Sequence, residues 1–559
     1  MFGKFSDVKY ERPDLEAVKA GIAKYMEDFK SAKTYEEAKK FFLDYQHSTE
    51  HLETMAEIAS VRNTIDKTDE FYDAEMNFYN EELPEFGPIT KAADELLLNS
   101  PFRAEFEKEY GSLFIKNMEM GQKLTSEAII PNQIEEAKLC QDYAKAVAVC
   151  TTDFHGENCN FYGLLKHMQS TDRAIRKEAF EAWAKMYAEV APELDEIYSK
   201  LTKVRLELAN KLGFDSYIDY VYLEKQRYDY KPSDIKNFRE AVKKYITPLC
   251  HELAEKQKER LGVDEFHYYD EALLFPEGNE NPVGTMPEMV QKAKQMYREM
   301  SKETGEFFDF MTEHDLFDLE SKPGKHMGGY CTFFNELRAP FIFSNFNGTS
   351  ADVDVLTHEA GHAFEAYAAS HNLPLLSMAW STSEINEIHA MSMEYFAYPW
   401  MENFFENADK YRYLHLTDSL RVIPYMVAVD EFQHRVFEKP DMTAEERYAV
   451  WHELEQYYLP WRDYDGNEFL EKGGFWMQKQ HIFLYPFYYI EYALAQMCTF
   501  MYYQKMQSDR AAAWADYYRL CCAGGSKGYF ELLEIGGLKN PFHEENIKSI
   551  AEMLESKLL

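Results

Sequence analysis

The sequence predicts a mainly α-helical protein with little β-structure. Apolar residues recur at steps of three and four within 15–148, 172–212 and 232–261, which is the spacing that lines one face of a helix. Prolines punctuate the first of these tracts at Pro84, Pro88 and Pro101. A short pair of β-prone runs near 147–162, separated by His155-Gly156, predicts a hairpin. Because an isolated hairpin is marginally stable, we expect it to pack on the surrounding helices.

The chain of 559 residues is long enough for several domains, although helical enzymes of this size can form one body. We expect an N-terminal helical region over residues 1–180, which includes the hairpin, and a helical region over 181–559 that contains the functional site. The clearest loop is 275–287, which is rich in proline and glycine and is expected to mark a boundary or to form a wall of the cleft. The two regions are expected to pack as one compact body.

Acidic residues outnumber basic ones, and the formal net charge is -37 with a sequence pI of about 4.9. Nucleic acid and anionic membranes would be repelled by such a chain, so neither is an expected partner. Eight cysteines occur without a C-x-x-C pair, which is typical of reduced thiols, although Cys150 and Cys159 could face each other across the hairpin. The N-terminus lacks an apolar leader, and we expect a soluble, cytoplasmic protein.

The stretch most informative about function is His358-Glu359-Ala360-Gly361-His362. Residues four apart lie one turn apart on a helix, so the two imidazoles can bind one metal ion. Glu359 then lies beside the ion, where a carboxylate can act as general base toward a water molecule. This pattern is typical of zinc peptidases.

The surrounding sequence supports a peptidase site. Pro340–Ser344 has strand character, and 345–350 is rich in turn-forming residues. Thr349 or Ser350 can cap the following helix. A strand, a turn and a helix with the histidine pair is the layout in which a strand edge can hold an extended peptide.

A catalytic zinc ion needs a third protein ligand and one open position. A second helix is expected to start near 381–383, and it carries three acids, Glu384, Glu387 and Glu394. Spacing does not decide between Glu384 and Glu387, because they lie three apart on one face. One can bind the metal while the other orients a histidine.

Together these motifs resemble peptidase family M3, which contains thimet oligopeptidase and oligoendopeptidase F, and they are closest to the oligoendopeptidase F branch. The resemblance runs nearly end to end. It is carried by His358–His362 with Glu387, by Gly328–Thr332, by Pro340–Ser350, by Glu387–Glu394, and by His481 with Phe487–Tyr492.

The resemblance implies a helical, thermolysin-like fold of the neurolysin type, with a small sheet beside the zinc helix and a deep substrate groove. It implies one zinc ion per chain on His358, His362 and Glu387, with Glu359 as base. Further catalytic contacts would come from His481, Tyr488, Tyr489 and Tyr492. Substrate contacts would come from Gly328, Gly329, Tyr330, Phe343, Ser344 and Asn345. The implied activity is zinc-dependent hydrolysis of internal bonds in short, unstructured oligopeptides.

One departure and two alternatives accompany this interpretation. After Glu387 the chain has Ile388-His389 where thimet-type enzymes have Pro-Ser, and we expect His389 to be a packed residue, or one that supports a ligand, rather than a ligand itself. An exopeptidase that releases dipeptides from the carboxyl end would share all of these motifs. A non-catalytic, zinc-containing peptide-binding protein is the other alternative, and the intact Glu359 argues against it.

Overall fold

The structure is a computed structural model that describes residues 3–322, 324–326 and 328–559. The chain is mainly α-helical with two small sheets, as predicted from the sequence. It separates into two compact units. Unit 1 comprises Met1–Thr125, Asn281–Ala408 and Met501–Lys539, and unit 2 comprises Ser126–Glu280, Asp409–Phe500 and Asn540–Leu559. The division expected between residues 180 and 181 falls inside a single helix, α9 (Arg173–Lys211), and each unit is assembled from three separate segments.

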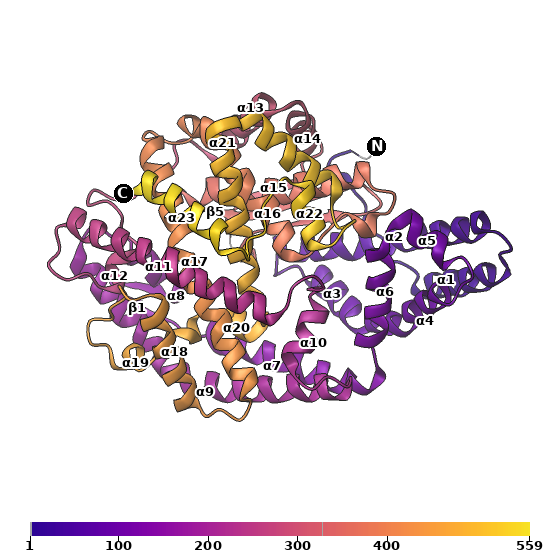
Figure 1. The fold of residues 1–559 in the computed structure, drawn as a ribbon, viewed down its shortest axis with the longest axis horizontal. Coiled ribbons are helices and arrows are strands. Elements are labelled where there is room, and N and C mark those ends of the chain that lie inside the picture. Colours follow the sequence, from indigo (N-terminus) through magenta and orange to yellow (C-terminus); the bar gives the residue numbers. More distant parts are fainter. Residues whose placement is uncertain (1–2, 323, 327) are drawn as a thin grey trace. The chain divides into compact units, whose positions relative to one another are not determined.

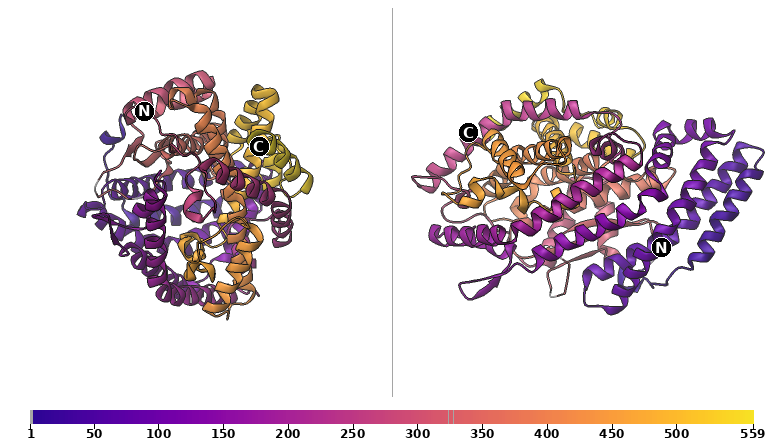
Figure 2. Two further views of the ribbon diagram at one scale, coloured as in Figure 1. Left: turned by 90° about the vertical axis from the view of Figure 1, so that its left-hand side faces the viewer. Right: turned by 90° about the horizontal axis from the view of Figure 1, so that it is seen from below.

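Unit 1 begins with helices that follow one another along the chain. They are α1 (Leu15–Ser31), α2 (Tyr35–Ile65), α3 (Glu70–Glu82), α4 (Phe86–Leu98), α5 (Arg103–Tyr110) and α6 (Ser112–Leu124). Helix α1 packs against α2 and α4, and these indigo helices run side by side in Figure 2. Side-chain caps start the first two, since Asp14 accepts from the Ala17 amide and Thr34 from the Glu37 amide. Phe42 lies in their core and is 1% exposed.

The central part of unit 1 consists of a three-stranded sheet and the helices around it. The helices are α13 (Met286–Met300), α14 (Lys302–Glu313), α15 (Ala351–Asn372), α16 (Ser383–Phe396) and α22 (Tyr529–Ile535). The strands are β3 (Phe317–Glu320), β4 (Tyr330–Phe334) and β5 (Ala339–Phe346), in the order β3-β5-β4. Strand β5 is parallel to β3 and antiparallel to β4, with Tyr330 opposite Phe343. Helix α15 lies against β5 and α16 (Figure 1).

Unit 2 contains the longest helices and the predicted hairpin. Its helices are α7 (Ile130–Ala148), α8 (Phe161–His167), α9, α10 (Tyr217–Glu224), α11 (Pro232–Leu261), α12 (Tyr268–Glu271), α17 (Ala408–Glu438), α18 (Ala444–Tyr458), α19 (Glu468–Glu471), α20 (Gln480–Leu484) and α23 (Glu544–Leu558). Helix α21 (Tyr489–Ala523) begins in unit 2 and continues in unit 1, with non-helical backbone angles at Asp509.

The hairpin consists of β1 (Thr152–Phe154) and β2 (Glu157–Cys159), which pair in antiparallel register. Its two turn residues have positive φ angles, 53° at His155 and 87° at Gly156, as expected for a tight two-residue turn. All eight cysteines are free, so Cys150 and Cys159 do not form a disulfide.

Within the part of the chain that the structure describes, every helix is either too short or too polar to cross a lipid bilayer.

Candidate functional site

The candidate site lies where α15 and α16 touch in unit 1. Gly361 makes this contact possible, because a Cβ atom there would lie 2.6 Å from the Cα of Ala390 and 2.7 Å from the carbonyl oxygen of His389. The turn before α15 is held by Asp352, whose carboxylate accepts from the amides of Asn347 (2.9 Å) and Gly348 (2.7 Å). Neither Thr349 nor Ser350 provides the expected cap, since the residue before the helix is Ser350 and its side chain makes no cap hydrogen bond.

The structure brings His358, His362 and Glu387 together. Their candidate ligand atoms all lie within 4.8 Å of one another. An Oε atom of Glu387 lies 3.4 Å from Nε2 of His358 and 3.8 Å from Nε2 of His362. Donor atoms placed 2.0–2.1 Å from a tetrahedral zinc ion are about 3.3 Å apart, so this spacing fits such an ion. Two imidazole nitrogens and one carboxylate oxygen are also the donor types that zinc prefers.

Glu394 orients one of these histidines. Its Oε1 atom lies 2.7 Å from Nδ1 of His358, which turns Nε2 of that ring toward Glu387. Metal-binding histidines commonly donate their second ring N–H to a carboxylate in this way. From the sequence alone, Glu394 is one of three candidate metal ligands, and the orienting acid is expected to be Glu384 or Glu387. The available signal was its spacing, since Glu394 follows Glu387 by seven residues, about two helical turns.

Burial and hydrogen bonds together shift the pKa values of the groups at this site. The pKa of Glu359 is raised to about 7 because burial disfavours its carboxylate form, an effect that His358 opposes. Burial also lowers the pKa of His362 to about 4. For His358 burial acts in the same downward direction, but hydrogen bonds to Glu387 and Glu394 outweigh it and raise its pKa. The Oε2 atom of Glu359 is buried and has no hydrogen-bond partner among the described residues.

The glycine pair before β4 lies beside Glu359. A Cβ atom at Gly329 would lie 3.7 Å from Oε1 of Glu359 and 3.3 Å from the carbonyl oxygen of Phe343. Gly328 has a φ angle of 92°, which favours glycine. Tyr330 begins β4 and stacks on Phe343 with ring centroids 4.8 Å apart. A side chain at residue 329 would therefore crowd Val355 and the backbone of β5 and would contact the Glu359 carboxylate.

Strand β5 is the central strand of the sheet, so its backbone has no free edge for a peptide. Direct pairing with substrate, which the sequence predicts for Phe343, Ser344 and Asn345, would therefore need a free edge that β5 does not have. Phe343 is paired with Tyr330 of β4 on one side and with Asp318 of β3 on the other, and its side chain is buried. Ser344 is buried as well, and the side chain of Asn345 donates to the carbonyl oxygens of His326 (2.8 Å) and Gly328 (2.9 Å). A peptide that adds to this sheet must pair with an outer strand.

His481 and the three tyrosines predicted to act with it lie together in unit 2. The ring centroid of His481 is 4.9 Å from that of Tyr489, 6.0 Å from that of Tyr488 and 6.3 Å from that of Tyr492. His481 belongs to α20, Tyr488 lies in the connection that follows it, and Tyr489 and Tyr492 begin α21.

Family models and solved structures both relate this chain to peptidases. The family model for the peptidase M3 N-terminal domain matches residues 5–125, and that for peptidase family M3 matches residues 166–552. A solved structure of PZ peptidase A with an inhibitor is 43% identical, with a TM-score of 0.93, and the match covers 99% of both chains. A protein from Bacillus anthracis, provisionally designated oligoendopeptidase F, is 40% identical over 100% of this chain and 98% of its own, with a TM-score of 0.89.

A more distant relative is the chromosomal oligoendopeptidase F of Lactococcus lactis subsp. cremoris. It is 23% identical over 71% of this chain, and the match spans 65% of that enzyme, just under two thirds of its length. The second family model alone covers more than half of the 559 residues and includes the complete histidine and glutamate cluster. The chain therefore belongs to peptidase family M3, a family of metallopeptidases.

Proposed function

We propose that this protein is a zinc-dependent endopeptidase that hydrolyses internal peptide bonds of short, unstructured oligopeptides. The observation that carries the proposal is the arrangement at α15 and α16. Three donor atoms have the spacing of a tetrahedral site, and the buried Glu359 carboxylate lies next to them. The names of the relatives, oligoendopeptidase F and PZ peptidase A, support the same activity.

His358, His362 and Glu387 would hold the ion, one per chain. When bound, zinc supplies the Lewis acidity that activates a water molecule and polarises the scissile carbonyl. Glu359 takes the proton from the attacking water and delivers it to the nitrogen of the leaving amine. Its carboxylate suits this task because it is buried next to His358 and Glu387.

His481, Tyr488, Tyr489 and Tyr492 are proposed to donate hydrogen bonds to the carbonyl oxygen as negative charge develops on it. Their clustering supports a shared role. We assign main-chain contacts with the substrate to Gly328, Gly329 and Tyr330, because β4 is an outer strand of the sheet. Phe343, Ser344 and Asn345 would support that strand from within. The substrate is expected to lie in a deep groove, which would exclude folded proteins.

We also infer that the enzyme works in the cytoplasm on peptides and binds neither nucleic acid nor membranes. Eight free cysteines suit a reducing compartment. The net charge of -37 disfavours polyanionic partners.

The test is cleavage of an internally quenched peptide blocked at both ends, by zinc-loaded wild type and by Glu359→Gln, with zinc content measured on both. We expect the wild type to cut the peptide and the variant to retain zinc while its kcat/KM falls by orders of magnitude. Zinc-loaded wild type that leaves blocked peptides intact would exclude an endopeptidase, and an unblocked peptide would then test the exopeptidase alternative.

A further inference from the structure

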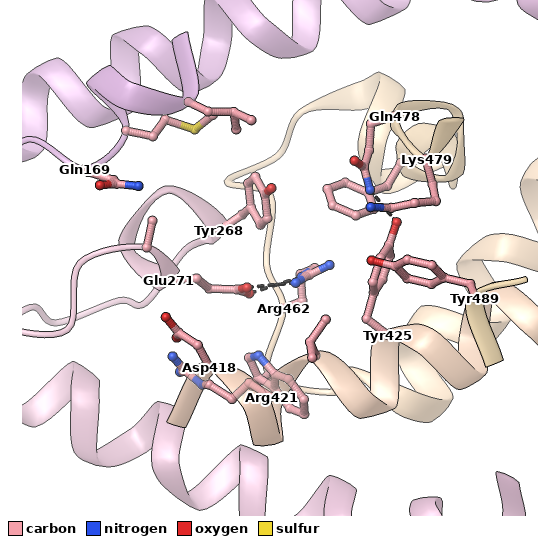
Figure 3. A pocket seen from close by; sticks show the side chains of 16 residues that line it. Gln169, Tyr268, Glu271, Asp418, Arg421, Tyr425, Arg462, Gln478, Lys479 and Tyr489 are labelled. Atoms are coloured by element: carbon pink, nitrogen blue, oxygen red, sulfur yellow. Dashed lines mark hydrogen bonds and ion pairs between the residues drawn. The ribbon is translucent and has the colours of Figure 1, made fainter. Parts of the chain in front are cut away.

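Unit 2 contains a cavity of about 420 Å³ that is separate from the histidine and glutamate cluster of unit 1. Its walls come from α8, α12, α17, the start of α21 and two connecting segments at 461–462 and 475–479. Figure 3 shows the side chains that line it. This volume suffices for one or two amino-acid residues of a ligand.

One part of the lining is aromatic. Tyr268, Tyr425 and Tyr489 face the cavity together with Phe475. The ring centroids of Tyr425 and Tyr489 are 5.8 Å apart, and those of Tyr268 and Phe475 are 5.3 Å apart. Such a wall favours an apolar or aromatic group on the ligand.

A fixed ion pair crosses the middle of the cavity. Arg462 donates two hydrogen bonds to the carboxylate of Glu271, at 3.1 and 2.8 Å, and its guanidinium lies 4.8 Å from the ring centroid of Phe475. In Figure 3 this pair lies between Tyr268 and the residues of α17. Because the charges of Arg462 and Glu271 neutralise each other, the pair shapes the cavity but adds no net charge to its lining.

Two further cations, Arg421 and Lys479, form no salt bridge with a described carboxylate, although the charge of Arg421 lowers the pKa of the nearby Asp418. The Nε and Nη2 atoms of Arg421 are buried, and no described protein group accepts a hydrogen bond from them. The Nζ atom of Lys479 lies 4.7 Å from the ring centroid of Tyr489 and 5.5 Å from that of Tyr425. Buried donors without acceptors are costly, and a ligand oxygen would satisfy them.

One acid in the lining, Asp418, would weaken the attraction of these cations for an anionic ligand. Asp418 precedes Arg421 by three residues on α17, and burial raises the pKa of its carboxyl group to about 6. In its charged form it would repel an incoming carboxylate. The lining therefore carries three cations and two carboxylates, an excess of positive charge in a chain whose net charge is strongly negative.

We propose that this cavity binds a peptide carboxylate that lies next to an apolar side chain, with Arg421 and Lys479 as the binding groups. The carboxylate comes either from the carboxyl terminus of a peptide or from an acidic side chain within it. The inference rests on the proposed peptidase function for the peptide nature of the ligand. Tyr489 belongs both to this lining and to the His481 cluster, so an occupant would lie beside residues proposed to act on the substrate.

The test measures equilibrium binding by titration calorimetry at pH 7.5, with zinc-loaded Glu359→Gln as the host so that cleavage does not interfere. The probes are N-acetyl-Ala-Ala-Phe as the free acid and as its carboxyl-terminal amide. We expect the free acid to bind about tenfold more tightly, because charge-assisted hydrogen bonds are the strong ones. A second pair of amidated peptides, with an internal Glu or Gln before the Phe, tests the side chain as the source.

Two substitutions are then added to the Glu359→Gln host one at a time, Arg421→Gln and Lys479→Met. Each should reduce the preference for the free acid over the amide. Asp418→Asn should increase it, a gain that a misfolded protein would not show. Lys236→Met, an exposed residue of α11, is the matched control and should leave the preference unchanged. Equal binding of acid and amide in both probe pairs, or a preference that survives Arg421→Gln and Lys479→Met together, would overturn the proposal.

The binding preference for the free acid can fail independently of the cleavage test of the proposed function. Wild type that cleaves blocked peptides, while acid and amide bind equally to the host, excludes the carboxylate site and leaves the endopeptidase intact. In the other case, the Glu359→Gln host prefers the free acid, but the wild type cleaves only unblocked peptides. This outcome supports the carboxylate site and favours the exopeptidase over the endopeptidase.

Discussion

The Nδ1 atom of His389 lies 3.0 Å from a carboxylate oxygen of Glu365, and neither side chain is exposed to solvent. The pair joins α16 to α15 next to the histidine and glutamate cluster, because beside burial the charge of His389 acts on the pKa of His362 and that of Glu387 on the pKa of Glu365. The hydroxyl of Tyr517 donates to the carbonyl oxygen of His389 at 2.9 Å and fixes this part of α16 further. His389 is thus packed between helices rather than placed as a metal ligand, and it holds in place the helix that carries Glu387.

Breaking this pair should weaken both the fold and the metal site. His389→Leu leaves the Glu365 carboxylate buried without its partner, which should destabilise the protein by about 3–5 kcal/mol. The double variant His389→Leu with Glu365→Leu removes both charges and should recover much of that loss. Denaturant unfolding and zinc affinity by chelator competition would check this. A double variant that is less stable than His389→Leu would contradict it.

Glu394→Gln should lower zinc affinity by about 10- to 100-fold, because the amide no longer holds Nδ1 of His358 as a carboxylate does. The fold should be retained, since one side-chain oxygen remains in place. Chelator competition on the purified variant measures the effect. Glu406→Gln, an exposed position in the same unit, is the control and should match the wild type.

Gly361→Ala should force α15 and α16 apart, because the added Cβ meets backbone atoms that cannot rotate away. We expect lower stability and weaker zinc binding together, since the Glu387 oxygen would move away from the histidine nitrogens. Gly121→Ala in α6 is the matched control, because nothing lies within 4 Å of its Cβ position. A helix interior gains up to about 1 kcal/mol from this change. Equal effects of the two substitutions on stability would refute the argument.

The sequence was sufficient to bring together two of the three candidate metal ligands, because their spacing is local. His358 and His362 share a helix face by periodicity alone, and resemblance selected Glu387. The position of β5 depended on β3, which lies more than twenty residues earlier in the chain, so its central place in the sheet could not be derived from Pro340–Ser344. The pairing of His389 with Glu365 likewise required knowing how α15 and α16 pack. The two units join distant segments. One boundary, between Glu280 and Asn281, falls in the proline- and glycine-rich loop 275–287, whereas the boundary between Phe500 and Met501 falls inside α21, where the sequence shows no break.

Glu455 should make stability depend on pH in unit 2. Burial raises its pKa to about 7 from an ordinary value of 4.5, although Arg462 and the hydroxyl of Tyr464 favour its charged form. Between these two values the folded state binds more protons than the unfolded state, so this group's contribution to stability falls as pH rises from 4.5 to 7 and is constant above. The whole effect is about 3 kcal/mol.

Glu455→Gln removes this titration. The unfolding free energy of the variant minus that of the wild type should therefore increase between pH 5 and pH 7 and level off above pH 7.5, as measured by urea unfolding at fixed ionic strength. Glu453→Gln, an exposed site on the same helix, α18, should give a nearly constant difference. A difference for Glu455→Gln that decreases with pH would mean that the pairing with Arg462 outweighs burial, and that the folded protein holds this carboxylate charged throughout.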